Sequence, residues 1–179
     1  MENIKMIDAK KIEKYKNLLL GVPGVTKAEY TNTIQSSVTT SWGVAWNADY
    51  IARDILQNFR DSNKSEIESI KVETKNDRIL VRAKNTFDLR KLLFLGSNKS
   101  GNDEMVGEFG EGYKASEVSL RKKGVSETIS ISGDQAVVIT LGEEVVDGMR
   151  PLIYHFFKCN SLNQTLFTFE SYDEELKKA

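Results

Sequence analysis

Residues 107–114 read GEFGEGYK, and the three glycines of this stretch, Gly107, Gly110 and Gly112, stand directly before a predicted helix. Glycine lets the backbone turn its N–H groups toward a phosphate, and the N-terminus of a helix favours negative charge. No Lys-Ser or Lys-Thr pair follows the last glycine, so the stretch is not a Walker loop. A polar loop precedes it instead of a strand, so it is not a Rossmann turn either. By itself, such a loop is as often a simple turn as a phosphate cradle.

A long amphipathic helix is predicted upstream, over residues 47–63, NADYIARDILQNFRDSN. Asn47 is a suitable N-cap, and Asp54, Asn58 and Asp61 recur at i, i+4 and i+7, so these three polar side chains share one face. The amide oxygen of Asn58 is a hard ligand of the kind that Mg²⁺ prefers, and the Asp54 carboxylate can orient or deprotonate an attacking water. Any surface helix carries a polar row, so this helix alone does not decide the function.

The remaining pattern predicts one α+β domain without internal repeats. A helix is predicted from Asp8 to Leu20, and residues 22–45, rich in Thr, Ser and Val, predict either an extended strap or an edge strand. Beyond the long helix, we expect a hairpin (IESIKVET and RILVRA), a short helix (FDLRKLLFL), a polar glycine-rich loop over 96–112, a helix (GYKASEVSLRKK) and four strands (ETISIS, QAVVITL, PLIYHFFK and QTLFTFES). This order predicts one mixed sheet covered on one face by helices, an α/β sandwich.

Composition argues against several classes of protein and site. The chain has 179 residues, with 25 basic and 26 acidic side chains, so no global basic field is present to attract nucleic acid. The single cysteine, Cys159, excludes an intramolecular disulfide framework and a multi-cysteine zinc site. The single histidine, His155, alternates with aromatic residues and is interpreted as structural. No apolar run is long enough to span a membrane and the charged first residues lack a signal-peptide core, so we expect a cytoplasmic protein.

Three stretches together resemble the GHKL ATPase superfamily: RDILQNFRDSN over 53–63, LGSNKS over 95–100 and VGEFGEGYKAS over 106–116. This superfamily includes type II topoisomerases, heat-shock chaperone ATPases, mismatch-repair ATPases and histidine kinases. The resemblance covers about residues 45–170, and the expected order of elements agrees with it. It implies a Bergerat nucleotide-binding fold, an α+β two-layer sandwich whose mixed, mostly antiparallel sheet is covered on one face by helices.

The resemblance also implies how the chain is divided. We expect an N-terminal arm with a helix over residues 1–44, a GHKL-like ATP-binding domain over 45–172 and a charged tail over 173–179. Several relatives complete their active site with a lysine from a following domain, for which this length leaves no room. We therefore expect nucleotide binding rather than fast hydrolysis.

The functional residues of the superfamily fall on particular positions of this chain. Its magnesium-binding asparagine falls on Asn58. Its acidic general base, usually glutamate, falls on Asp54, whose shorter side chain is expected to slow hydrolysis. Residues 96–112 correspond to the ATP lid, which we expect bound nucleotide to order. The implied cofactors are ATP and Mg²⁺, and the implied nucleotide-binding positions are Asn58, Asp61, Asn85, Asp88, Ser97, Lys99, Gly107, Glu108, Phe109, Gly110, Glu111, Gly112, Tyr113 and Lys114.

One part of the family pattern is missing. After the second hairpin strand the family has Asp-x-Gly-x-Gly, whose aspartate accepts a hydrogen bond from the amino group of adenine. Here residues 83–87 read AKNTF, and Asp88 follows. Asn85 can supply an amide oxygen as the acceptor, and Asp88 can reach in if the loop is reshaped. Alternatively, Asn85 or Thr86 is simply the N-cap of the helix that follows. The sequence leaves the base specificity open.

Two functions of different classes are compatible with these residues. The first is an Mg²⁺-dependent ATP-binding protein, with an adenine nucleotide as its ligand, that acts as a slow ATPase. The alternative is a degenerate Bergerat domain that binds a protein partner, or a second copy as a homodimer, without hydrolysing nucleotide. The missing Asp-x-Gly-x-Gly motivates this alternative. Neither function predicts binding to nucleic acid or to a membrane. A histidine-kinase-like phosphotransfer domain ranks last, because the chain has no phosphoacceptor-helix histidine.

Overall fold

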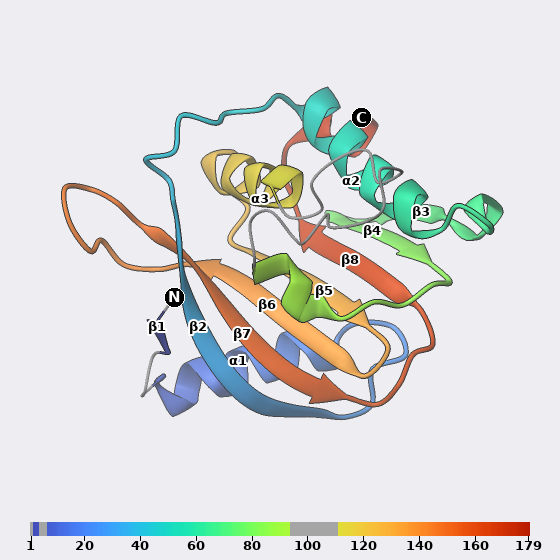
Figure 1. The fold of residues 1–179 in the computed structure, drawn as a ribbon, viewed down its shortest axis with the longest axis horizontal. Coiled ribbons are helices and arrows are strands. Elements are labelled where there is room, and N and C mark those ends of the chain that lie inside the picture. Colours follow the sequence, from blue (N-terminus) through green and yellow to red (C-terminus); the bar gives the residue numbers. More distant parts are fainter. Residues whose placement is uncertain (1, 4–6, 94–110) are drawn as a thin grey trace, which may run out of the picture.

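The computed structural model describes residues 2–3, 7–93 and 111–179, and these form an α+β fold built on one open antiparallel sheet (Figure 1). The sheet has seven strands, and a two-residue strand, β1 (Glu2–Asn3), adds to one edge. The strand order is β1-β2-β7-β6-β5-β8-β4-β3. The seven strands are β2 (Ala28–Thr39), β3 (Lys71–Lys75), β4 (Arg78–Ala83), β5 (Glu127–Ser132), β6 (Gln135–Leu141), β7 (Pro151–Cys159) and β8 (Thr165–Glu170).

Four α-helices and two short 3₁₀ helices are present within the described ranges. They are α1 (Ala9–Leu20), α2 (Ala48–Ser62), α3 (Glu111–Lys122) and α4 (Glu174–Lys178), with η1 (Ile67–Ser69) and η2 (Leu89–Leu93). The expected caps are present: Asn47 accepts a hydrogen bond from the first turn of α2, and Gly124 follows α3 with φ 87°. None of the described helices is both long and apolar enough to cross a bilayer.

Every neighbouring strand pair among the described residues is antiparallel, whereas the sequence predicted a mixed sheet. Tight two-residue turns cause much of this arrangement. Asn76 (φ 56°) starts the turn between β3 and β4, and Gly133 (φ 60°) starts the turn between β5 and β6. Positive φ values at such turns match the twist of antiparallel hairpins, and parallel neighbours would need long crossovers instead.

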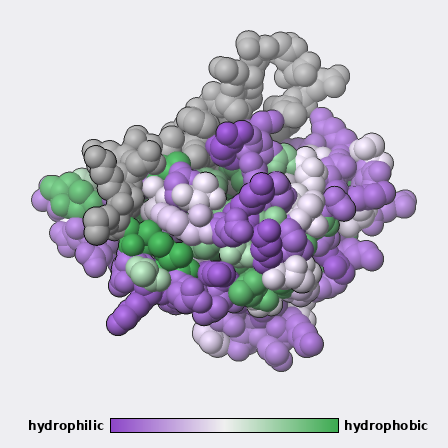
Figure 2. All heavy atoms as spheres, turned by 90° about the horizontal axis from the view of Figure 1, so that it is seen from below, coloured by the Kyte–Doolittle hydropathy of each residue, from purple (hydrophilic) through white to green (hydrophobic). Residues whose placement is uncertain are grey.

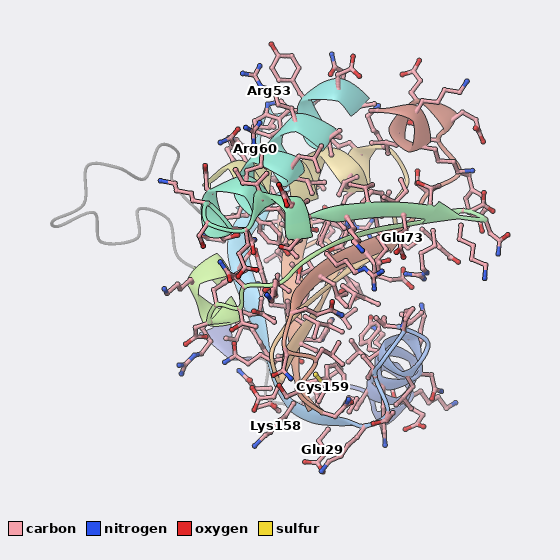
Figure 3. All side chains as sticks on the ribbon, turned by 90° about the vertical axis from the view of Figure 1, so that its right-hand side faces the viewer. Glu29, Arg53, Arg60, Glu73, Lys158 and Cys159 are labelled. Atoms are coloured by element: carbon pink, nitrogen blue, oxygen red, sulfur yellow. The ribbon has the colours of Figure 1, made fainter. Side chains whose placement is uncertain are left out.

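Helices cover both faces of the sheet, so the expectation of helices on one face only is wrong. The helix α1 packs on one face through Tyr15 and Leu19, and α2 and α3 pack on the other (Figure 3). The central strands bury both of their faces, with Ile129, Ile131, Ala136, Val138 and Phe157 toward α1 and with Val137, Ile139, Tyr154 and Phe156 on the opposite side. Strands that are apolar on both faces need cover on both.

The N-terminal arm is part of the sheet. The stretch left open as a strap or an edge strand contains β2, which pairs with β7 along most of its length and, among the described residues, has only β1 beyond it. The described arm therefore belongs to the same folded unit as the remainder of the described chain.

On the face shown in Figure 2, hydrophilic side chains cover most of the surface and the hydrophobic ones gather in small groups.

His155, on β7, is a buried residue whose contacts are all within the fold. Its Nδ1 lies 3.1 Å from the hydroxyl oxygen of Thr33, its Nε2 lies 3.0 Å from that of Thr140, and its ring stacks on Tyr15 at a centroid distance of 4.5 Å. Burial, with a smaller contribution from the charge of Lys11, lowers the pKa of His155 from 6.5 to about 4. The folded protein therefore contains a neutral histidine over most of the mildly acidic range.

Acidification is expected to destabilise the fold through this group. Between pH 6.5 and 4 the unfolded chain binds a proton at His155 that the folded chain does not, so the free energy of unfolding falls as the pH falls. The full loss is about 3 kcal/mol, and a His155→Gln variant lacks it. Urea unfolding at several pH values checks this, since carboxylate titrations are shared by both proteins. Parallel pH profiles for the two would contradict the assignment.

Candidate functional site

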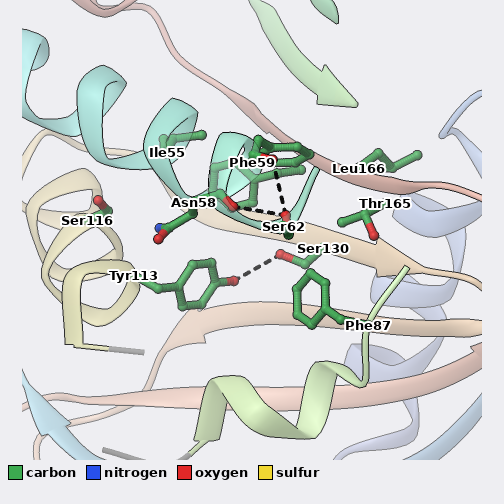
Figure 4. A pocket seen from close by; sticks show the side chains of 11 residues that line it. Ile55, Asn58, Phe59, Ser62, Phe87, Tyr113, Ser116, Ser130, Thr165 and Leu166 are labelled. Atoms are coloured by element: carbon green, nitrogen blue, oxygen red, sulfur yellow. Dashed lines mark hydrogen bonds between the residues drawn. The ribbon is translucent and has the colours of Figure 1, made fainter. Parts of the chain in front are cut away.

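A pocket lies between α2, α3 and the face of the sheet formed by β5 and β8 (Figure 4). Its walls are mainly aromatic and aliphatic, and hydroxyl and amide groups interrupt them. The lining side chains are those of Ile55, Asn58, Phe59, Ser62, Phe87, Tyr113, Ser116, Ser130, Thr165, Leu166 and Phe167. Apolar walls with a few convergent polar groups are typical of a small-molecule site.

The cavity inside this pocket is small. Its volume is about 40 Å³, which holds only a few water molecules and is far below that of a usual ligand pocket. A nucleotide base is larger than this cavity. Phe87, which lies between β4 and η2, lines the pocket and packs against the buried cluster that includes Leu89 and Val118.

Asp54, Asn58 and Gly112 lie close together beside the pocket, and of the three only Asn58 is among its lining residues. The side-chain amide of Asn58 donates to Oδ2 of Asp54 at 3.3 Å, one helical turn apart on α2. Gly112, in the first turn of α3, lies so close that a Cβ there would overlap Oδ1 of Asp54. Burial raises the pKa of Asp54, and its hydrogen bonds with Ser116 and Asn58 partly oppose that rise.

Ser116 is a member of this cluster that the sequence reasoning missed. It is 1% exposed, and its hydroxyl donates to Oδ2 of Asp54 at 2.7 Å across the gap between α3 and α2. The signal that could have found it is its spacing from Gly112. The two residues are four apart and so lie on one face of α3.

Tyr113 and Lys114 differ in their relation to the pocket. The Tyr113 hydroxyl lies 2.9 Å from that of Ser130, and both residues line the pocket. Burial raises the pKa of Tyr113 far above its usual range, so the phenol is neutral. Lys114 is 2% exposed and is not among the lining residues. Of the two, only Tyr113 lies where it can contact a ligand in the cavity.

Asn85 lies between the end of α2 and the start of β8. Its backbone N–H donates to Oδ1 of the buried Asn63 at 2.9 Å, and its side-chain amide donates to the carbonyl oxygen of Ser62, also at 2.9 Å. Thr165 donates its hydroxyl to the Asn85 carbonyl at 2.6 Å. Asn85 is not itself among the pocket-lining residues, and these bonds join it to two that are, Ser62 and Thr165. Asn63 and Thr165 were not anticipated, because nothing in their local sequence marks them.

Asp88 caps the short helix η2. Its carboxylate accepts a hydrogen bond from the backbone N–H of Arg90 at 3.0 Å and forms an ion pair with the Arg90 guanidinium. This partner holds the pKa of Asp88 well below its usual range. The cap expected from Asn85 or Thr86 is thus supplied by Asp88, which is not among the pocket-lining residues.

The other expected positions lie away from the pocket or outside the described residues. Asp61 accepts a hydrogen bond from Gln57 on α2 at 2.8 Å and does not line the pocket. Glu111 is the first residue of α3. Ser97, Lys99, Gly107, Glu108, Phe109 and Gly110 lie outside the described residues, as does most of the expected lid over 96–112. Within the described ranges, no three His, Cys, Asp or Glu side chains converge as a metal site.

Comparisons with known proteins do not assign the chain to a family. No protein-family model matches it. No curated protein matches it either. The resemblance to the GHKL superfamily therefore rests on the sequence motifs of this chain alone.

Proposed function

We propose that this chain is a Mg²⁺-dependent ATP-binding protein of the GHKL type, with a Bergerat-type fold and slow ATP hydrolysis. The observation that carries the proposal is the close approach of Asp54 and Asn58 on α2 to Gly112 in the first turn of α3, beside an aromatic pocket. The general base and the metal-binding amide were inferred from one helix, the end of the phosphate loop from a separate stretch of sequence, and this geometry supports their use in one site.

The orientation of the Asn58 amide suits a cation. Because its NH₂ group donates to Asp54, its oxygen is the end left for Mg²⁺, which prefers oxygen ligands. Magnesium, when bound, neutralises part of the charge on the phosphates. The first turn of α3 offers backbone N–H groups and the positive end of the helix dipole to the same phosphates. Asp54 is the group that takes a proton from the attacking water.

In this proposal, the side chain of Asn85 is the group that selects adenine over guanine. Because its NH₂ group donates to the Ser62 carbonyl, the amide oxygen is the group left for a ligand. An acceptor suits the amino group of adenine and is mismatched to the keto oxygen of guanine. Asn85 is neutral, however, so this contact is weaker than the one made by the aspartate of the family.

A second candidate function is a domain that binds a protein partner or a second copy and no nucleotide. The small cavity, together with the missing Asp-x-Gly-x-Gly, favours it. The two functions differ in one observable property. A ligand that binds only the folded state must raise the stability of the protein, whereas a domain that no longer binds nucleotide is unaffected by it.

Thermal unfolding with and without nucleotide separates the two candidates. At a free ATP concentration of roughly a hundred times Kd, binding adds about 2.7 kcal/mol. For a chain of this size, that raises the midpoint by roughly 5–10 °C. We expect the rise with ATP and Mg²⁺, a smaller one with ATP and a chelator, and a smaller one again with GTP. A midpoint that no nucleotide changes at millimolar concentration favours the protein-binding function.

A further inference from the structure

The Asp54 carboxylate of α2 lies against two residues of α3, Ser116 and Gly112. The two residues are four apart and face the same side of α3. The Ser116 hydroxyl bonds to Oδ2 of Asp54 at 2.7 Å, and the missing side chain of Gly112 makes room for Oδ1. The short side chain of an aspartate on α2 can reach these two residues only because α2 and α3 approach closely here.

The two carboxylate oxygens of Asp54 have different surroundings. Oδ2 accepts two hydrogen bonds, one from Ser116 at 2.7 Å and a longer one from Asn58 at 3.3 Å. Oδ1 accepts none from the described residues and lies against the first turn of α3, beside Gly112. The Ser116 bond is the shorter of the two and comes from a side chain that is 1% exposed, so it fixes the rotation of the carboxylate.

We infer that Ser116 is a positioning residue. Its hydrogen bond occupies Oδ2 of Asp54 and leaves Oδ1 as the oxygen that accepts a proton. This inference rests on the proposed function. In the step concerned, the water oxygen bonds to the γ-phosphorus, the bond between that phosphorus and ADP breaks, and the proton of the water passes to Oδ1 before release to solvent. Ser116 touches none of the reacting atoms and acts only through Asp54.

Ser119 supplies a matched control on the same helix. It is also 1% exposed, and its hydroxyl accepts a hydrogen bond from the backbone N–H of Trp46 at 3.0 Å. Ser119→Ala therefore removes one buried hydroxyl and one hydrogen bond from α3, as Ser116→Ala does, but leaves Asp54 untouched. A purely structural role for Ser116 predicts that the two variants behave alike.

The test is steady-state hydrolysis of Mg²⁺-ATP by the full chain, with the Kd of the same complex measured by calorimetry. We expect Ser116→Ala to lower kcat by roughly tenfold or more with KM changed by less than about twofold, because orientation of the base is lost and binding is not. Ser116→Thr, which keeps the hydroxyl, should restore most of kcat. Ser119→Ala should keep kcat close to that of the wild type. Ser116→Cys, nearly the same size, replaces the alanine variant if that variant does not fold.

The outcomes separate this inference from the proposed function. An unchanged kcat in Ser116→Ala, or an equal loss in Ser119→Ala, overturns the positioning role. Wild-type protein that binds Mg²⁺-ATP but does not hydrolyse it also overturns the positioning role and leaves ATP binding standing. Wild-type protein that binds no Mg²⁺-ATP overturns both.

Discussion

Replacing Asn58 with alanine is expected to weaken Mg²⁺-ATP binding by roughly a hundredfold, about 2.7 kcal/mol, and to remove the effect of Mg²⁺ on that binding. The variant loses the amide oxygen assigned to the cation, and ATP without its magnesium keeps the full charge on its phosphates. Calorimetric titration with ATP, once with Mg²⁺ and once with a chelator, measures the two affinities directly. In the variant they should be nearly equal.

Two other variants of α2 sharpen this prediction. Gln57→Ala, one residue earlier, removes an exposed side chain that donates to Asp61, and we expect Mg²⁺-dependent binding to survive it. Asp54→Ala should spare binding and stop turnover, because the base acts on water and not on the cation. Magnesium-dependent binding that persists in Asn58→Ala would refute the metal role of this residue. Turnover that persists in Asp54→Ala would refute the assignment of the base.

Replacing Arg121 with methionine is expected to destabilise the fold by about 3–5 kcal/mol, a large part of the total for a domain of this size. Arg121 forms an ion pair with Glu117 at 3.0 Å, and their side chains are 1% and 0% exposed. Thr128 donates to the Glu117 carboxylate, and Arg121 donates to the carbonyl oxygen of Ile139 at 2.6 Å. Without Arg121, a buried carboxylate loses its counter-charge beneath α3.

The double variant Glu117→Leu/Arg121→Met should be more stable than the single Arg121→Met variant, because it leaves no buried charge. The pair is also incompletely bonded, since Nε and Nη1 of Arg121 are buried with no hydrogen-bond partner among the described residues. The exposed pair of Lys84 and Glu66 is the control, and Lys84→Ala should cost less than about 1 kcal/mol. Urea unfolding measures all three. A double variant no more stable than the single one would contradict this account.

Local chemistry allowed most of the elements to be predicted. Asn47 marked the start of α2, Gly124 marked the end of α3, and the β-branched and aromatic runs of the last third became β5 to β8. The position of α1 was not predictable in this way. It depends on contacts such as that of Tyr15 with His155, which lie far apart in the sequence.

In the candidate site, too, some residues could be predicted from the local sequence and others could not. The chemical identities and spacing of Asp54, Asn58 and Gly112 marked them in the sequence, and the fold brings them together. Ser116 and Thr165 carry common hydroxyl side chains, and their contacts arise only when α3 and β8 pack beside α2 and the Asn85 segment. Residues that act through tertiary contacts in this way carry little local signal, which for Ser116 is only its spacing of four residues from Gly112.

Whether this protein binds ATP with Mg²⁺ is measured by a calorimetric titration of ATP into the wild-type protein, in the presence and in the absence of Mg²⁺. We expect saturable binding in the presence of Mg²⁺ and clearly weaker binding in its absence. No binding of any adenine nucleotide at millimolar concentration, with or without Mg²⁺, would contradict the proposed function.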